Sequence, residues 1–146
     1  MQFKVRIPFV DLLGFTLQRF EPGESEIHLE LRDELTNSWG VAHGGVTMTL
    51  LDVVMAHAAR SATAPGGEVQ PGVVTIEMKT SFMRPGQGTL IATGKRLHKT
   101  SSLAFCEGWV HDAAGALVGH ATGTFKFMKG LPVGGGQRIQ RLNASD

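Results

Sequence analysis

The sequence has few features that would indicate an oxidising compartment or a membrane. Its 146 residues include a single cysteine, Cys106, which cannot form a disulfide within the chain. This favours a reducing cytoplasm. No apolar run reaches the roughly 18 residues that a membrane-spanning helix needs. The first residues also lack the apolar core and the small-residue cleavage site of a signal peptide. We therefore expect a cytoplasmic protein.

Charged residues are also sparse. They make up 18% of the chain, the formal net charge is +1, and no block of one sign occurs. This balance argues against a nucleic-acid or membrane-surface partner. The six histidines are scattered, with no close pair at ligand spacing, so no metal site is expected. Apolar residues, in contrast, form 42% of the chain, which is enough to bury the core of one domain.

Glycine marks the boundary between a domain and a tail. Residues 134–136 are three consecutive glycines, and mostly polar residues follow them. This composition is typical of flexible segments. We predict one domain over residues 1–129 and a flexible tail over residues 130–146.

Hydrophobic periodicity predicts the elements of the domain. A short helical turn is expected near residues 8–13, and residues 25–32 alternate apolar and polar side chains as a half-buried strand does. Residues 45–62 are almost wholly apolar or small, and they suit a buried helix of about five turns. Four strands follow, joined by short turns, which suggests an antiparallel meander. In the first of these strands, regular alternation places on one face Val74, Ile76, Met78, Thr80 and Phe82.

The order of these elements predicts the fold class. Two strands precede the long helix, residues 25–32 and an earlier stretch over residues 15–20 that also alternates, and four strands follow it. A sheet must cover its apolar face, and one central helix can do so if the sheet curls around it. We therefore predict an α+β fold in which a curled antiparallel sheet wraps around one long helix.

The start of the long helix has an unusual composition. Gly44 and Gly45 leave backbone N–H groups uncovered by side chains, and the first N–H groups of a helix have no partner within it. Together with the helix dipole, such a terminus favours an anion or a developing oxyanion. Close packing of the helix on the sheet explains the two glycines equally well.

Asp52 is the one carboxylate in this apolar helix. No Lys or Arg lies within one helical turn of it. A buried ionised carboxylate costs several kcal/mol unless hydrogen bonds or a counter-charge compensate it. Asp52 is therefore either a core residue satisfied by donors such as the Thr49 hydroxyl, or a general base or nucleophile whose pKa is tuned by burial.

The spacing of Gly44 and Asp52 constrains how they can act together. They are eight residues apart, which is about 12 Å along a helix. One carbonyl carbon cannot lie within about 3 Å of both. If both serve one reaction, they come from two copies of the helix packed antiparallel about a two-fold axis. The spacing thus predicts a homodimer with two shared sites, provided that both residues are catalytic.

Two residues before the helix are further candidates. The Asn37 amide could donate to the same oxygen as the Gly44 N–H, but the surrounding sequence TNSWG is equally typical of a turn. His43 could act as a base. Because no acidic residue is placed to orient it, a structural role at the helix start is the favoured interpretation.

These residues form a motif that resembles a known family. The pattern N-x-x-G-x-x-H-G-G-x-x-x-x-L-x-D resembles the hotdog-fold acyl-CoA thioesterases, most closely the phenylacetic-acid-degradation (PaaI-like) type. It is formed here by Asn37, Gly40, His43, Gly44, Gly45, Leu50 and Asp52. The resemblance implies a hotdog fold, a homodimer that often pairs into a homotetramer, and hydrolysis of small aromatic or medium-chain acyl-CoA.

The family also implies roles for individual residues. The amide matching Gly44 polarises the thioester carbonyl with the side chain matching Asn37, and the acid matching Asp52, from the partner subunit, activates water or attacks directly. A third-strand hydroxyl often holds the water. Thr75 matches it, although regular alternation puts Thr75 on the face opposite Ile76. No metal or bound cofactor is implied, because coenzyme A belongs to the substrate.

Cations are expected where the nucleotide end of coenzyme A would lie. The candidates are Arg84, Lys95, Arg96 and Lys99, each of which is also explained as solvated surface charge. Two other functions stay open: a non-catalytic acyl-CoA-binding hotdog protein, and an acyl-thioester dehydratase or hydratase. The acid at position 52 argues against the first, and its spacing from the glycines argues against the second.

Overall fold

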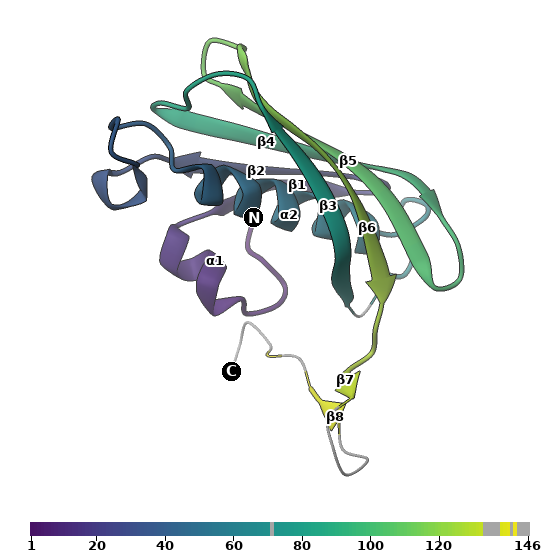
Figure 1. The fold of residues 1–146 in the computed structure, drawn as a ribbon. Coiled ribbons are helices and arrows are strands. Elements are labelled where there is room, and N and C mark those ends of the chain that lie inside the picture. Colours follow the sequence, from purple (N-terminus) through teal and green to yellow (C-terminus); the bar gives the residue numbers. More distant parts are fainter. Residues whose placement is uncertain (71, 133–137, 141, 143–146) are drawn as a thin grey trace.

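One long helix lies in the hollow of a curved antiparallel sheet (Figure 1). The computed structural model describes residues 1–70, 72–132, 138–140 and 142. The helical elements are α1 (Pro8–Leu13), the 3₁₀ turn η1 (Asp33–Leu35) and α2 (Gly44–Arg60). The strands are β1 (Thr16–Glu21), β2 (Glu24–Glu30), β3 (Val73–Phe82), β4 (Thr89–Lys99), β5 (Leu103–Asp112), β6 (Leu117–Phe127), β7 (Leu131–Pro132) and β8 (Arg138–Ile139).

Six strands form the main sheet, in the order β1-β2-β4-β5-β6-β3, and all neighbours are antiparallel. The predicted α+β hotdog architecture is confirmed, and β4, β5 and β6 follow one another as a meander. The meander prediction was wrong for β3, which pairs with β6 rather than with β4 and so lies at an edge of the sheet. Alternation within a strand reports which face is buried but not which strand lies beside it.

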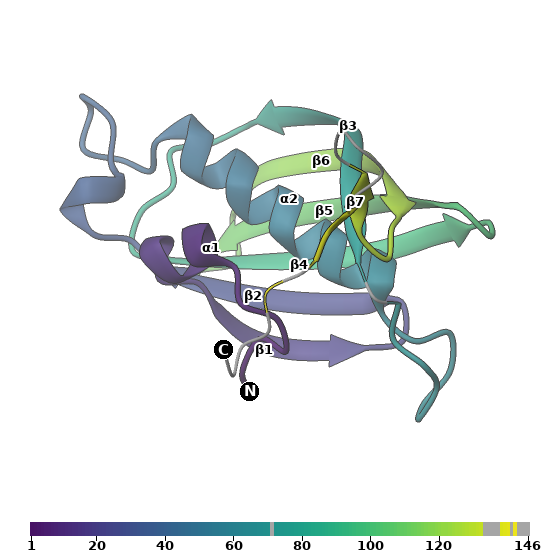
Figure 2. The same cartoon turned by 90° about the horizontal axis from the view of Figure 1, so that it is seen from below.

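α2 packs closely on the concave face of this sheet (Figure 2). The side chains of α2 that have no exposed surface include Leu50, Leu51, Val54 and Met55. The strands beneath them carry glycines at the points of contact. A Cβ on Gly94 of β4 would lie 2.5 Å from Val54 O, and one on Gly108 of β5 would lie 3.0 Å from Met55 Cγ. The helix therefore sits lower on the sheet than larger residues would allow.

A side chain from β4 caps the C-terminal end of α2. Arg96 Nη1 donates to Ser61 O at 2.8 Å and to Ala59 O at 3.2 Å, and Nη2 donates to Ala62 O at 3.3 Å. The last carbonyls of a helix lack partners within it and carry partial negative charge. The Arg96 guanidinium satisfies these carbonyls and so stabilises the end of α2.

β3 contains a β-bulge at Ile76. In its pairing with β6, Thr75 lies opposite Phe125 and Glu77 lies opposite Thr124, so Ile76 is an extra residue. Phe125 is fully buried, which means that Thr75 also faces the helix side of the sheet.

The bulge overturns the predicted faces of this strand. Because it inserts one residue, Thr75 shares the helix-facing side with Met78 and Thr80, whose partners in β6 are Gly123 and Ala121. The prediction that Val74 and Ile76 share a face with Met78 and Thr80 was wrong, because an inserted residue interrupts the alternation of faces along the strand.

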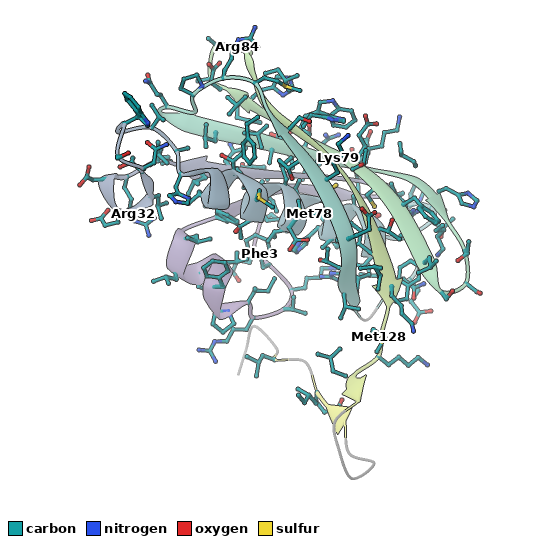
Figure 3. All side chains as sticks on the ribbon, viewed as in Figure 1. Phe3, Arg32, Met78, Lys79, Arg84 and Met128 are labelled. Atoms are coloured by element: carbon teal, nitrogen blue, oxygen red, sulfur yellow. The ribbon has the colours of Figure 1, made fainter. Side chains whose placement is uncertain are left out.

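The N-terminal segment lies on the side of α2 that faces away from the sheet (Figure 3). α1 spans the predicted residues 8–13: proline stands at its start, and Gly14 ends it with φ +80. Before α1, the ring of Phe3 contacts the ring of His57 on α2 edge-on, with centroids 5.1 Å apart.

The predicted tail, residues 130–146, lies partly outside the described residues. In its described part, Leu131 of β7 pairs with Ile139 of β8. Leu142 O accepts a hydrogen bond of 3.2 Å from Arg6 N–H. The hydrogen bond of Leu142 brings this described tail residue beside the N-terminal segment.

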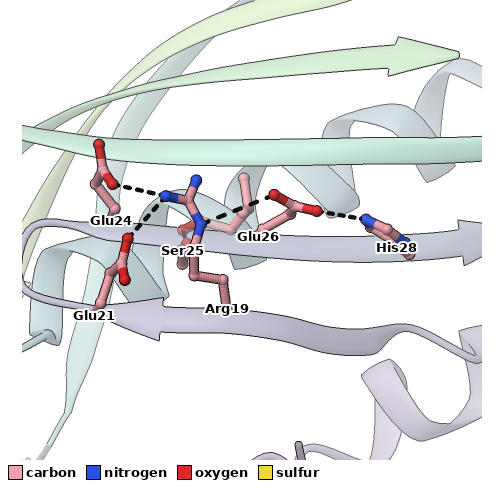
Figure 4. A network of polar contacts seen from close by, with 7 residues as sticks. Arg19, Glu21, Glu24, Ser25, Glu26 and His28 are labelled. Carbon is pink, nitrogen blue, oxygen red and sulfur yellow. Dashed lines mark hydrogen bonds and ion pairs between the residues drawn. The ribbon is translucent and has the colours of Figure 1, made fainter. Parts of the chain in front are cut away.

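The convex surface near the β1–β2 edge is polar (Figure 4). Arg19 Nη1 lies 2.8 Å from carboxylate oxygens of both Glu21 and Glu24, and Glu26 Oε1 lies 2.6 Å from His28 Nε2. All five side chains are partly exposed, and ion pairs in such positions contribute little to stability. This network is an ordinary solvated surface.

Candidate active site

Asp52 and Thr75 form a polar pair between the central helix and the edge strand. Thr75 Oγ1 donates to Asp52 Oδ1 at 2.7 Å. Thr75 reaches α2 because the bulge at Ile76 sets its face. Thr49, which the sequence offered as a donor to Asp52, donates instead to Gly45 O at 2.8 Å. The partner of Asp52 thus comes from a strand more than twenty residues away.

Burial and hydrogen bonding act on Asp52 in opposite directions. Burial raises the pKa of Asp52 above its ordinary value, and the hydrogen bond from Thr75 offsets part of this rise. A carboxylate with increased proton affinity is a stronger general base while it remains ionised at the working pH. Asp52 is chemically suited to take a proton from water.

The first N–H groups of α2 have different surroundings. His43 is the N-cap residue, and its Nδ1 accepts a hydrogen bond of 2.9 Å from Gly45 N–H. Among the described residues, the Gly44 N–H has no hydrogen-bond partner. Because His43 Nδ1 accepts this hydrogen bond, it carries no hydrogen of its own in the neutral ring. In this structure His43 orients the helix start, and Gly44 supplies the donor that remains.

Asn37 lies in a tight turn before α2, and the turn fixes its orientation. Its Oδ1 accepts hydrogen bonds from Trp39 N–H at 2.9 Å and from Val41 N–H at 3.4 Å. The turn continues through Gly40, whose φ of +73 strains other residues. Because the side-chain oxygen serves the turn, the amide nitrogen is the group that can donate to a ligand. The turn and donor interpretations of Asn37 are therefore compatible.

Gly44 and Asn37 line one cleft, and Asp52 lines another pocket. The first cleft has a volume of about 520 Å³ and is also lined by Trp39, Phe82 and Arg84. The second, about 240 Å³, contains Asp52 and Thr75. One chain thus brings Gly44, Asn37 and Arg84 together but keeps Asp52 apart from them, which agrees with the spacing of about 12 Å along α2.

The four candidate cations lie at opposite ends of α2. Arg84 lies beyond the end of β3 (Figure 3) in the Gly44 cleft, where its Nη1 donates to Leu117 O at 2.9 Å. Lys95, Arg96 and Lys99 belong to the final part of β4, beside the C-terminal end of α2. Lys95 is exposed, whereas the Arg96 guanidinium serves the helix end. Of the four, only Arg84 lies close to Gly44.

Two side chains at these sites were missed by the sequence analysis. Trp39 is 87% exposed in the Gly44 cleft, and a tryptophan inside a polar turn was a usable signal for it. Arg60 is 5% exposed and lines the Asp52 pocket. Nothing in the sequence marks Arg60 as buried, because its burial depends on distant residues such as Phe20, whose ring lies 5.2 Å from the guanidinium carbon.

Other chemistries have little support in the described part of the chain. No group of three or more His, Cys, Asp or Glu is placed there to hold a metal ion, and no helix has the length and hydrophobicity to cross a membrane. Cys106 is buried, and burial raises the pKa of its thiol to about 12. It is a core residue rather than a nucleophile.

Comparison with known proteins identifies the family. The thioesterase superfamily model matches residues 40–118. A Halobacterium salinarum protein named as an esterase is 31% identical over 101 residues, 67% of this chain and 66% of the relative. The medium/long-chain acyl-CoA thioesterase YigI of Salmonella typhimurium is 25% identical over 135 residues, 84% of this chain and 87% of the relative. The PaaI protein of Escherichia coli, from the phenylacetic acid degradation operon, superposes with a TM-score of 0.74 at 20% identity, covering 82% of this chain and 83% of PaaI. The chain belongs to the thioesterase superfamily of hotdog-fold hydrolases.

Proposed function

We propose that this protein hydrolyses acyl-CoA thioesters with small aromatic or medium-chain acyl groups to the free acid and coenzyme A. The observation that carries the proposal is the half-buried Asp52 carboxylate, which Thr75 holds at 2.7 Å. Thioester hydrolysis needs a base for water and a donor for the oxyanion. Asp52 supplies the first and the Gly44 N–H supplies the second. The similarity to a bacterial acyl-CoA thioesterase supports coenzyme A thioesters as the substrate class.

The reaction follows from these groups. The Gly44 N–H and the Asn37 amide donate to the thioester carbonyl oxygen, and Asp52 accepts a proton from water as the water oxygen attacks the carbonyl carbon. The negative charge of the tetrahedral intermediate lies on the oxygen that the donors hold. When the C–S bond breaks, the proton passes from Asp52 to the departing sulfur, and the carboxylate is restored. Direct attack by Asp52 through a mixed anhydride uses the same groups.

The shared site requires a two-fold dimer, and β3 offers the contact. β3 is an edge strand of ten residues with apolar side chains in solvent: Ile76 is 54% and Phe82 is 53% exposed. Exposed apolar edges of this length favour pairing with another strand.

Antiparallel pairing of two β3 strands would assemble the site. It would place the Thr75 end of one strand beside the Phe82 end of the other. Asp52 accepts a hydrogen bond from Thr75. Gly44 lies against Phe82, since a Cβ on Gly44 would be 3.6 Å from that ring. Gly44 of one subunit would thereby meet Asp52 of its partner, and further pairing of dimers gives a tetramer.

The positions of the four candidate cations favour some of them as contacts of coenzyme A. Arg84 lines the cleft that contains Gly44, so its guanidinium is placed to bind a phosphate of the bound substrate. Lys95 and Lys99 lie at the other end of α2, and an antiparallel partner would bring that end toward the same cleft. Arg96 is not a proposed contact, because its guanidinium caps the C-terminal end of α2.

A panel of acyl-CoA substrates tests the proposed activity. Purified protein is mixed with coenzyme A thioesters of straight-chain and aromatic acids, and released thiol is measured. Hydrolysis of small aromatic or medium-chain members supports the proposal. Tight acyl-CoA binding without thiol release would favour a non-catalytic acyl-CoA-binding protein, and hydration or dehydration without release would favour the hydratase class.

Mixing two inactive variants tests the shared site. Asp52→Asn removes the base, and Gly44→Pro removes the N–H donor. A heterodimer of the two has one site with both defects and one intact site. Random pairing of equal amounts therefore restores about a quarter of the parent activity. A site built within one chain would recover nothing, and this result would exclude the shared arrangement.

A further inference from the structure

The two pockets of the proposed site have different roles in holding the substrate. The cleft that contains Gly44 also contains Arg84, the proposed phosphate contact. The thioester carbonyl of the proposed reaction lies between the Gly44 N–H of one subunit and Asp52 of its partner. Because the coenzyme A side of the thioester runs toward Arg84, the acyl side enters the pocket that contains Asp52. The apolar walls of this pocket are Ile7, Val53, Ala56 and Val73.

These apolar walls come from three elements and are accessible. Ile7 is the N-cap residue of α1, Val53 and Ala56 belong to α2, and Val73 is the first residue of β3. All four residues are partly exposed, so a ligand can reach them. An acyl chain that covers them removes apolar surface from water, and each methylene buried in this way strengthens binding about fourfold.

Toward the C-terminal end of α2 the pocket is closed by His57 and Arg60. They are only 3% and 5% exposed. The rings of Phe3 and Phe20 contact the His57 ring edge-on, and the Phe20 ring centre lies 5.2 Å from the Arg60 guanidinium carbon. Arg60 Nη1 also donates to Gln70 O at 3.3 Å. These contacts hold both side chains in place, so they form a fixed inner end of the pocket.

The rise of α2 gives the length of this pocket. His57 and Arg60 follow Asp52 by five and eight residues, which is about 7.5 and 12 Å along a helix. An extended chain advances about 3.5 Å for every three bonded atoms, so about six to ten chain atoms fit between Asp52 and the closed end. The pocket volume of about 240 Å³ also exceeds the roughly 150 Å³ that accommodates benzene in a protein core.

We infer that the Asp52 pocket binds the acyl group, and that Ile7 and Ala56 set the length of acyl group that it accepts. The inference rests on the proposed thioesterase function and defines its substrates as coenzyme A thioesters with an apolar acyl group of up to about ten carbons. Ala56 has the smallest side chain of the four walls, so a larger residue there would fill the pocket. Ile7 belongs neither to α2 nor to the sheet, so a smaller residue there would enlarge the pocket without moving Asp52.

A series of straight-chain acyl-CoA substrates tests the closed end. We expect kcat/KM to rise about fourfold for each added methylene from butanoyl-CoA to octanoyl-CoA, because each further carbon is buried against the walls. Dodecanoyl-CoA has more carbons than the pocket holds, so its kcat/KM should not exceed that of octanoyl-CoA. A rise that continues at the same rate through dodecanoyl-CoA would show that the pocket has no closed end and would overturn the inference.

Two substitutions in the walls should move the preferred length in opposite directions. Ala56→Leu places three more carbons in the pocket, and we expect it to lower the kcat/KM ratio of octanoyl-CoA to butanoyl-CoA by about tenfold or more. Ile7→Ala removes three carbons, and we expect it to raise the ratio of dodecanoyl-CoA to octanoyl-CoA by about tenfold. Unchanged ratios in both variants would overturn the role of these residues.

Ile91→Ala is the matched control for Ile7→Ala. Ile91 belongs to β4 and does not line the Asp52 pocket, so its loss removes the same three carbons elsewhere and should leave the length preference of the parent protein. An equal change of preference in this control would show that the pocket is not the cause, and would contradict the role of Ile7. If Ala56→Leu does not fold, Ile7→Ala and this control decide.

Failure of the inference is distinguishable from failure of the proposed function. If acyl-CoA is hydrolysed and both variants keep the length preference of the parent, the acyl pocket is wrong and the thioesterase stands. If no acyl-CoA releases thiol, the proposed function fails, and calorimetric titration with octanoyl-CoA and butanoyl-CoA tests the pocket alone. Tighter binding of octanoyl-CoA that Ala56→Leu abolishes supports the pocket, and equal binding of the two by the parent overturns it.

Discussion

Replacing Gly44 with proline removes one hydrogen atom from the proposed oxyanion site and disturbs little else. Gly44 is the first residue of α2, a position where helices accept proline because its missing N–H has no partner within the helix. His43 before it has ψ 136, within the range that a residue before proline prefers. The nearest side chain to a Cβ at Gly44 would be Phe82, at 3.6 Å, an ordinary contact.

The expected losses of activity and of stability differ widely. Removal of one oxyanion donor typically lowers kcat by about 10²–10³, equivalent to about 2.7–4 kcal/mol of transition-state stabilisation. The Gly44 N–H has no partner among the described residues, so the folded chain loses no hydrogen bond that the structure records. We therefore expect the free energy of unfolding to change by about 0.5 kcal/mol or less.

Gly44→Ala is the control for steric effects. It adds the same Cβ but keeps the N–H, so any loss it shows measures crowding of the cleft. The assay is initial-rate thiol release with the most active acyl-CoA, and urea unfolding and native mass confirm that both variants keep the parent fold and assembly. We expect the alanine variant to retain kcat within about tenfold.

Two results would refute this role of Gly44. If the proline variant keeps kcat within about threefold of the parent, less than 1 kcal/mol, the N–H does not stabilise the transition state. If the alanine variant loses as much as the proline variant, the glycine is needed for space and not for its donor. Unfolding of the proline variant would contradict the reasoning about the helix start itself.

Three further substitutions test the surrounding structure. Asp52→Asn is expected to lower kcat by about 10²–10⁴ and to raise the free energy of unfolding near neutral pH, because burial disfavours the ionised carboxyl. The gain in stability is full at pH values above the raised pKa of Asp52 in the folded protein. It disappears as the pH falls below the ordinary pKa of 3.8, where Asp52 is protonated in both the folded and the unfolded protein. A lower free energy of unfolding in urea at neutral pH would contradict this prediction. Thr75→Val removes the hydrogen bond that lowers the pKa of Asp52, so the acid limb of the kcat/KM profile should move to higher pH, while Thr75→Ser should leave it in place; an unmoved limb in the valine variant would show that Asp52 is not the titrating base. Arg96→Met should lower the free energy of unfolding by about 2–3 kcal/mol, since hydrogen bonds from charged groups contribute about 1.5–3 kcal/mol, and should leave the KM for acyl-CoA unchanged. A raised KM with unchanged stability would restore Arg96 as a coenzyme A contact.

The fold was predictable where local sequence decides it. Pro8 and Gly14 delimit α1, and an uninterrupted apolar stretch marks α2 as a central helix. The place of β3 was not predictable, because the alternation of a strand does not report which strand lies beside it, and β3 is exposed along much of its length. The bulge at Ile76 was also hidden, since a β-branched residue in a strand carries no sign that it is the inserted one.

The candidate site was predictable in composition but not in contacts. Gly44 and Asp52 stand out because a bare helix start and a lone acid are unusual in an apolar helix. The bond between Thr75 and Asp52 depends on the bulge, and the use of Arg96 depends on how β4 crosses the helix end. Arg60 looks in the sequence like any polar residue that ends a helix, and only the packing of Phe20 and α2 reveals it as buried.

The glycines beneath α2 have a consequence for how this protein can change over time. Gly94 and Gly108 let the helix rest directly on β4 and β5. A substitution at Gly94 would press on the α2 backbone at Val54, and so would displace Gly44 and Asp52, the two residues of the proposed reaction, together. New substrate preferences are therefore expected to arise elsewhere, from residues that touch only the acyl group. Ile7 and Val73 line the Asp52 pocket from outside the helix, so they can vary in size while the reacting groups stay in place. The position of α2 is thus expected to stay constant, while the pocket residues outside the helix are free to change.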